Sequence, residues 1–190
     1  MNRRVQDALD AHTRPIIRAV KAIVAEQVFV TLSPHASDPT ARVAEISSPQ
    51  GRPFRLKTEG RADRLWLRCR VSLRVPLPPK SDSPDAVEIT VDSYAYQLFR
   101  GDGQTRLDEV VAYHWTPNDP AAKRSWPHLH VGSAFLDPVA RREPWLLHKT
   151  HFLTGPITAA GFVRMAVEEF GVQPIAADWA DRLAGELPVS

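Results

Sequence analysis

Apolar and polar residues alternate most regularly in the middle of the chain, over residues 65–75. The odd positions of this run are apolar, whereas the even positions hold Trp66, Arg68, Arg70, Ser72 and Arg74. Alternation with a period of two is typical of a β-strand that buries one face. We therefore expect a strand here whose second face is turned to solvent or to a ligand.

Further extended segments follow this strand. Residues 87–99, 107–115 and 128–131 are rich in β-branched, aromatic or alternating residues, and a last extended segment ends near residue 153. The sequence Gly101-Asp102-Gly103 separates the first two, which predicts an antiparallel hairpin. Together these segments predict a sheet of about five strands in a region spanning residues 64–153.

The part of the chain before this region has weaker strand signals. Residues 33–53 contain four prolines among serines, a composition that favours loops. Only short strands, at residues 28–32 and 43–46, are predicted in or beside it.

Helical periodicity is found near both ends of the chain. Apolar residues recur mostly at intervals of three, four or seven over residues 1–25, which predicts an amphipathic N-terminal helical segment. Pro15 lies inside this segment and removes a backbone donor, so one long helix and two shorter helices both fit the pattern.

The C-terminal helices are predicted over residues 154–190. Residues 157–170 have a helical period, Thr154 or Thr158 can serve as the N-cap, and Gly171 can end the helix. A shorter helix is expected near residues 178–187.

This order of elements predicts an α+β fold. Consecutive strands favour a mostly antiparallel sheet, and the N-terminal and C-terminal helices are expected to pack on one of its faces. A length of 190 residues fits a single domain covering residues 1–190.

The cysteine content, the lengths of the apolar runs and the net charge indicate the compartment and the partners to expect. The one cysteine, Cys69, permits neither an intrachain disulfide nor a cysteine-based zinc cage, and it fits a reducing cytoplasm. No stretch approaches the roughly 20 apolar residues that span a bilayer, so no membrane partner is expected. With a net charge of +2, attraction to nucleic acid would have to come from local clusters.

Histidines form the most conspicuous candidate site. The chain lacks the glycine-rich nucleotide loops, the metalloprotease helix motif and the lipase-type serine motif. In contrast, five of its seven histidines fall within 38 residues, at His114, His128, His130, His148 and His151. His128 and His130 would lie on the same face of an extended segment, about 6–7 Å apart.

Three imidazoles on one sheet could perform two kinds of chemistry. If the strand carrying His114 neighbours His128 and His130, the three nitrogens would suit zinc or another divalent transition ion. Without metal, one imidazole could accept and another donate a proton during cleavage of an RNA phosphodiester. A His-x-His pair can also be ordinary packing, and His148 and His151 are weaker candidates.

A polar loop lies between these histidines. It contains Asn118, which could orient an imidazole, and Lys123 and Arg124, which could hold a phosphate. The Asn118-Asp119-Pro120 sequence is also typical of a solvated β-turn.

Positive charge gathers on residues 51–74, where eight arginines and lysines stand against two acidic residues. On the predicted strand, Trp66, Arg68, Arg70 and Arg74 share one face, an arrangement that suits stacked bases and phosphate oxygens. The alternative is that arginines keep an exposed sheet face soluble.

One family resemblance covers residues 87–171. It rests on the Tyr94-Ala-Tyr segment, the Gly101-Asp-Gly turn, the segment ending at Asp119, Pro127-His-Leu-His130 and the helix near residues 161–170. In this order of parts the chain resembles the TumE-like toxins of bacterial toxin-antitoxin pairs. The spacing around Asn118 and Asp119 departs from that family, and only His128 and His130 carry over directly.

The resemblance implies a ribonuclease-like toxin with a cognate antitoxin protein as partner. Together with the histidines it gives the leading hypothesis, an RNA-acting protein in which His114, His128 and His130 are acid, base or metal ligands. The alternatives are a noncatalytic module that binds nucleic acid or protein, and a metal site that serves stability alone.

Overall fold

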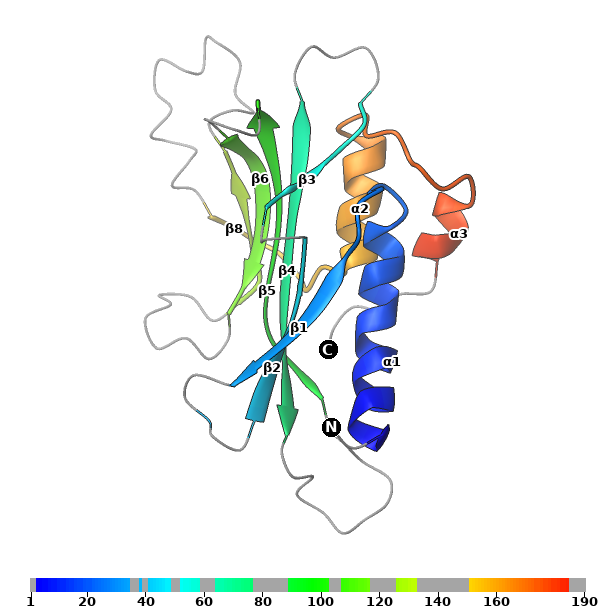
Figure 1. Cartoon of the computed structure of the whole chain (residues 1–190). Helices are drawn as coiled ribbons and strands as arrows, with labels where there is room; N and C mark the ends of the chain where they lie inside the picture. Colours follow the sequence, from blue (N-terminus) through cyan, green and yellow to red (C-terminus); the bar gives the residue numbers. More distant parts are fainter. Residues whose placement is uncertain are drawn as a thin grey trace.

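A computed structural model describes residues 3–34, 38, 41–48, 52–58, 64–76, 89–102, 107–116, 126–132 and 151–184. These residues form an eight-stranded antiparallel sheet and three helices (Figure 1), so the α+β class is confirmed. The strands are β1 (Phe29–Pro34), β2 (Ala41–Ser47), β3 (Phe54–Arg55), β4 (Leu65–Pro76), β5 (Thr90–Gly101), β6 (Leu107–Trp115), β7 (His128–Val131) and β8 (His151–Leu153). The helices are α1 (Arg3–Val20), α2 (Ala159–Glu168) and α3 (Trp179–Leu183).

The sheet is larger than the sequence pattern predicts. Its order is β1-β2-β4-β5-β6-β7-β8, and β3 also pairs with β4. The prediction of about five strands is therefore wrong, because β1, β2 and β3 extend the sheet beyond β4. Periodicity is a weak signal there: β3 has two residues, and all six residues of β1 are exposed.

The strands from β4 to β7 follow the predicted segments closely, and the predicted hairpin between β5 and β6 is confirmed. In β4 the odd positions, such as Leu67 and Val71, are buried, and they form one face of the sheet. The even positions, including Arg68 and Arg70, form the other face. We call this second face the histidine face, because His114, His128 and His130 lie on it.

The helices confirm several local predictions. The N-terminal segment is a single helix with Pro15 inside it, so the alternative of two shorter helices is not adopted. Thr158 is the N-cap of α2, and its hydroxyl accepts a hydrogen bond from the Gly161 backbone N–H at 3.0 Å. Gly171, with φ +66°, follows the end of α2 in the left-handed region that glycine tolerates best.

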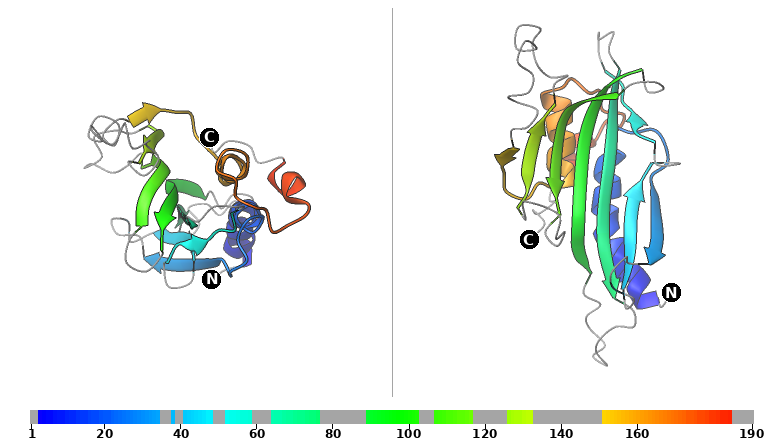
Figure 2. Two further views of the ribbon diagram at one scale, coloured as in Figure 1. Left: turned by 90° about the horizontal axis from the view of Figure 1, so that it is seen from above. Right: turned by 90° about the vertical axis from the view of Figure 1, so that its left-hand side faces the viewer.

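Aromatic side chains join α2 to the face of the sheet opposite the histidine face. The ring of Phe162 lies 5.6 Å from that of Tyr96 in β5 and 6.0 Å from that of Tyr113 in β6. In the right-hand view of Figure 2 the long strands stand in front of α1 and α2. Within the described residues, none of the helices has both the length and the apolar run needed to cross a membrane.

The phenols of Tyr94 in β5 and Tyr113 in β6 predict a loss of stability at high pH. Burial raises the pKa of Tyr94 and of Tyr113, and the N–H of Ile157, which donates to the Tyr94 hydroxyl at 3.3 Å, offsets only part of this for Tyr94. In the unfolded chain both phenols ionise near pH 10, whereas in the folded chain they stay neutral to higher pH. The free energy of unfolding should therefore fall as pH rises above about 10.

Urea denaturation at pH 9 and pH 11 measures this effect. The double variant Tyr94→Phe, Tyr113→Phe should lose less stability between these two pH values than the original chain does. An equal loss in both proteins would show that other groups cause the alkaline destabilisation.

Candidate metal centre and its pocket

Neighbouring strands bring three histidines together. β6 and β7 pair antiparallel, with His114 opposite His128 and Ala112 opposite His130. Because side chains alternate along a strand, His128 and His130 share a face, and the register adds His114 to it. The small side chain of Ala112 leaves room beside His130.

The three rings lie close enough to share one ion. Ring centroids are 4.9 Å apart for His114 and His130, 5.0 Å for His128 and His130, and 6.0 Å for His114 and His128. One nitrogen from each ring lies within 4.8 Å of the other two, and all three side chains are half-buried. Zn–N bonds of about 2.0–2.1 Å at tetrahedral angles separate ligand nitrogens by about 3.3 Å. The rings therefore need to close by at most about 1.5 Å.

A backbone contact sets the orientation of His128. Its Nδ1 lies 3.0 Å from the carbonyl oxygen of Trp126. A carbonyl oxygen only accepts, so Nδ1 carries the proton and donates it. In the neutral ring the lone pair is then on Nε2, which is the arrangement that metal-binding histidines commonly use.

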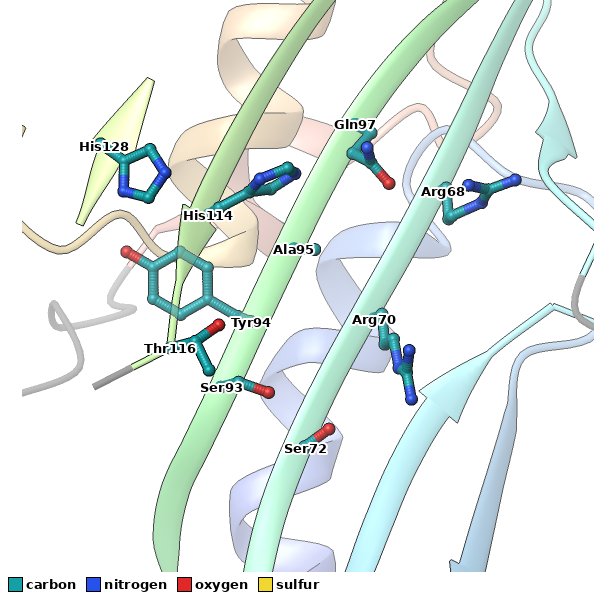
Figure 3. A pocket seen from close by; sticks show the side chains of 10 residues that line it. All are labelled: Arg68, Arg70, Ser72, Ser93, Tyr94, Ala95, Gln97, His114, Thr116 and His128. Carbon is teal, nitrogen blue, oxygen red and sulfur yellow. The ribbon is translucent and has the colours of Figure 1, made fainter. Parts of the chain in front are cut away.

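A pocket of about 530 Å³ adjoins the histidines on the histidine face. Figure 3 shows its lining from four neighbouring strands, with His114 and His128 at one end and Arg68 and Arg70 at the other. The remaining lining residues are Ser72, Ser93, Tyr94, Ala95, Gln97 and Thr116. This volume lies within the range of about 300–1,000 Å³ found for small-molecule sites.

Small and polar side chains separate the two ends of the pocket. Ser72 pairs with Ser93 in the register of β4 and β5, and Ala95 lies opposite His114. Gln97 donates from Nε2 to Oε2 of Glu109 at 2.8 Å, which fixes which end of its amide is the oxygen. Sequence reasoning missed these residues, although the alternation in the strands places several of them on the same face as Arg68 and Arg70.

The predicted arginine stripe lies on the histidine face, but its members differ in their surroundings. The guanidinium of Arg68 lies over the ring of Phe99, 4.9 Å from the centroid. Arg70 binds one carboxylate oxygen of Glu45 in β2, with distances of 3.1 Å from Nε and 3.0 Å from Nη2. In Figure 3 both head groups are directed away from the histidines.

The two ends of the stripe are engaged by other groups. The indole N–H of Trp66 donates to the carbonyl oxygen of Gly101 at 2.9 Å. Arg74 lies 3.7 Å from a carboxylate oxygen of Asp38 and 3.8 Å from one of Asp92. Neither residue lines the pocket. A continuous RNA-binding stripe along β4 is therefore less well supported than the sequence pattern indicates.

Other candidates cannot be placed at the site. Asn118, Lys123, Arg124 and His148 lie outside the described residues. β8 places the backbone of His151 opposite His130, a neighbour that spacing along the chain does not reveal.

Comparisons with known proteins give no relative for this chain. No family model, no curated protein and no solved structure matches it.

Three imidazoles from adjacent strands supply a ligand set for a divalent transition ion. Three protein ligands leave one position of a tetrahedral ion for water or substrate, as in catalytic zinc sites. Here a pocket adjoins the same cluster.

Proposed function

We propose that the protein is a metal-dependent phosphodiesterase that acts on RNA. His114, His128 and His130 would bind a divalent transition ion, with zinc as the first candidate. The observation that carries this proposal is the approach of three imidazole nitrogens to within 4.8 Å of one another beside a pocket. We also propose that the helices at both chain ends pack on the face of the sheet opposite the histidine face. The histidine face is then left for the substrate.

Metal binding is favoured over purely acid-base chemistry by the positions of the rings. An acid and a base act on opposite sides of a reacting phosphate, at the attacking and the leaving oxygen. His114 and His128 instead lie together at one end of the pocket (Figure 3), and one ring nitrogen from each of the three histidines lies within 4.8 Å of the other two. Convergence suits a shared ion better than two separate proton transfers.

The proposed reaction is hydrolysis. A zinc ion lowers the pKa of its bound water to about 7, which supplies hydroxide at neutral pH. The hydroxide oxygen would form a bond to phosphorus, and the bond from phosphorus to the leaving oxygen would break. The leaving oxygen would take up a proton from water.

RNA is the substrate class because the sequence resembles the TumE-like toxins and because Arg68 and Arg70 line the same pocket as His114 and His128. The same resemblance supports a cognate antitoxin protein as partner. A cytoplasmic location completes the proposal, based on the single cysteine. The chain would then act as a growth-inhibiting ribonuclease.

The metal requirement of RNA cleavage tests this proposal. Protein treated with a chelator and dialysed should lose at least about 100-fold of its cleavage rate, and one equivalent of zinc should restore it. Cleavage that survives complete removal of metal would favour acid-base catalysis by the same histidines. Stoichiometric zinc without any cleavage would favour the structural metal site, and RNA binding without zinc or cleavage would favour the noncatalytic module.

A further inference from the structure

The two arginines that line the pocket, Arg68 and Arg70, both lie at one of its ends. Of the four residues in the predicted stripe, only Arg68 and Arg70 line the pocket. Glu45 engages Arg70 through Nε and Nη2, and a guanidinium has five N–H donors, so Arg70 has donors beyond those that face Glu45. The guanidinium of Arg68 lies over the ring of Phe99, 4.9 Å from the centroid, a cation–π contact with a ring face rather than an ion pair with a carboxylate.

The arginine end and the histidine end are too far apart for one phosphate to reach both. Arg68 and Arg70 are on β4, His114 is on β6, and β5 lies between these strands. Two strand spacings of about 4.7–4.9 Å separate β4 from β6 by about 9.5 Å. The arginine head groups are also directed away from the histidines (Figure 3), which increases the separation.

We propose that the pocket binds two successive phosphates of a short RNA, one at the histidines and one at Arg68 and Arg70. This inference rests on the proposed function, since it assigns the scissile phosphate to the metal centre. It limits the bound segment to about two nucleotides, because the pocket volume of about 530 Å³ is that of a small-molecule site.

The floor of the pocket fits such a ligand. Ser93 and Ala95 have small side chains on β5, between the two ends, so the sugar and backbone linking two phosphates can lie across β5. Gln97 directs its amide nitrogen to Glu109, which leaves its carbonyl oxygen as an acceptor. A ribose hydroxyl is a donor that such an oxygen can recognise, and this contact would favour RNA over DNA.

The test measures binding rather than cleavage, so that it stands apart from the proposed function. Metal-free protein is titrated with the 5′-phosphorylated dinucleotide pUpU, with UpU and with a uridine 12-mer. The terminal phosphate should make pUpU bind at least about tenfold more tightly than UpU, because charge-assisted contacts to arginine depend on it.

Salt dependence distinguishes a two-phosphate pocket from a continuous stripe. For single strands, the slope of log K against log[salt] is about −0.7 per neutralised phosphate. The pocket predicts a slope no steeper than about −1.4 for the 12-mer. A strand bound along all the cations of β4 and its neighbours, four phosphates or more, would give about −2.8 or steeper.

Two arginine variants form a matched pair. Arg68→Gln should weaken pUpU binding at least about tenfold, whereas Arg74→Gln should change it less than about twofold, because Arg74 lies with Asp38 and Asp92 outside the pocket. Ala95→Leu should block the floor and abolish pUpU binding. Cooperative urea unfolding of each variant confirms that it folds.

Each outcome decides the inference. Equal losses in Arg68→Gln and Arg74→Gln, or a slope near −2.8 for the 12-mer, would overturn it in favour of a stripe. Equal affinities for pUpU and UpU, or no binding of either, would also overturn it. Adding zinc should then tighten pUpU binding, and a failure of this last step alone would contradict the metal centre rather than the arginine subsite.

Discussion

Alanine in place of any one of His114, His128 and His130 should reduce zinc affinity by at least about 100-fold. Losing a residue that only orients a metal ligand already costs about 10–100-fold in affinity or activity, and these three residues are proposed as the ligands themselves. RNA cleavage should fall in parallel. Cobalt(II) titration measures the effect, since a tetrahedral site has an intense visible absorption that the variants should lose.

His12 supplies the matched control for these variants. It is an exposed residue of α1, and its ring nitrogen lies 2.9 Å from the carbonyl oxygen of Ala8, on a different element from the cluster. His12→Ala should therefore bind cobalt and cleave RNA as the original chain does. Unchanged cobalt spectra in all three cluster variants would refute a metal centre at this position.

The melting temperature separates the two roles that a metal could have. If the ion is catalytic, metal-free protein and the cluster variants should melt within a few degrees of the zinc-loaded protein. If the ion holds β6 and β7 together, zinc should stabilise the fold strongly, because binding to the folded state alone adds its free energy to folding.

Much of the fold follows from local patterns. The alternation over residues 65–75 predicts β4 and its buried face, and the His-x-His spacing predicts that His128 and His130 share a face. The N-cap Thr158 and the glycine after α2 are local signals of the same kind. Such signals depend only on neighbouring residues, and for that reason they can be read from one sequence.

Long-range pairing accounts for what could not be predicted. Whether His114 meets His128 depends on the register of β6 and β7, which a one-residue shift would reverse. The pairing of β2 with β4 depends equally on which strands become neighbours. The same is true of the contacts of Arg70 with Glu45 and of Arg74 with Asp92. Spacing permits these contacts without determining them.

The pairing of β6 with β7 beside the histidines requires a glycine at position 132. Gly132 directly follows β7, and its N–H donates to the carbonyl oxygen of Val110 at 2.8 Å. A Cβ atom at this position would lie 1.7 Å from the carbonyl oxygen of Glu109 and 2.4 Å from its carbonyl carbon. Both are backbone atoms of β6, so the strands themselves would have to separate.

Gly132→Ala should therefore displace the end of β7 from β6 and move His128 and His130 relative to His114. We expect a loss of about 1–3 kcal/mol in the free energy of unfolding, as for other overpacked sites, together with at least about tenfold weaker cobalt binding. Urea denaturation and cobalt titration measure the two effects.

Gly155→Ala is the control, because a Cβ at Gly155 would have nothing within 4 Å. It should change stability by less than about 0.5 kcal/mol and leave cobalt binding intact. If Gly132→Ala behaved like this control, the close approach of β7 to β6 would not be what holds the histidines together. If Gly132→Ala lost cobalt binding but still unfolded cooperatively, metal binding would require the relative positions of the three imidazole rings and not only the three histidines themselves.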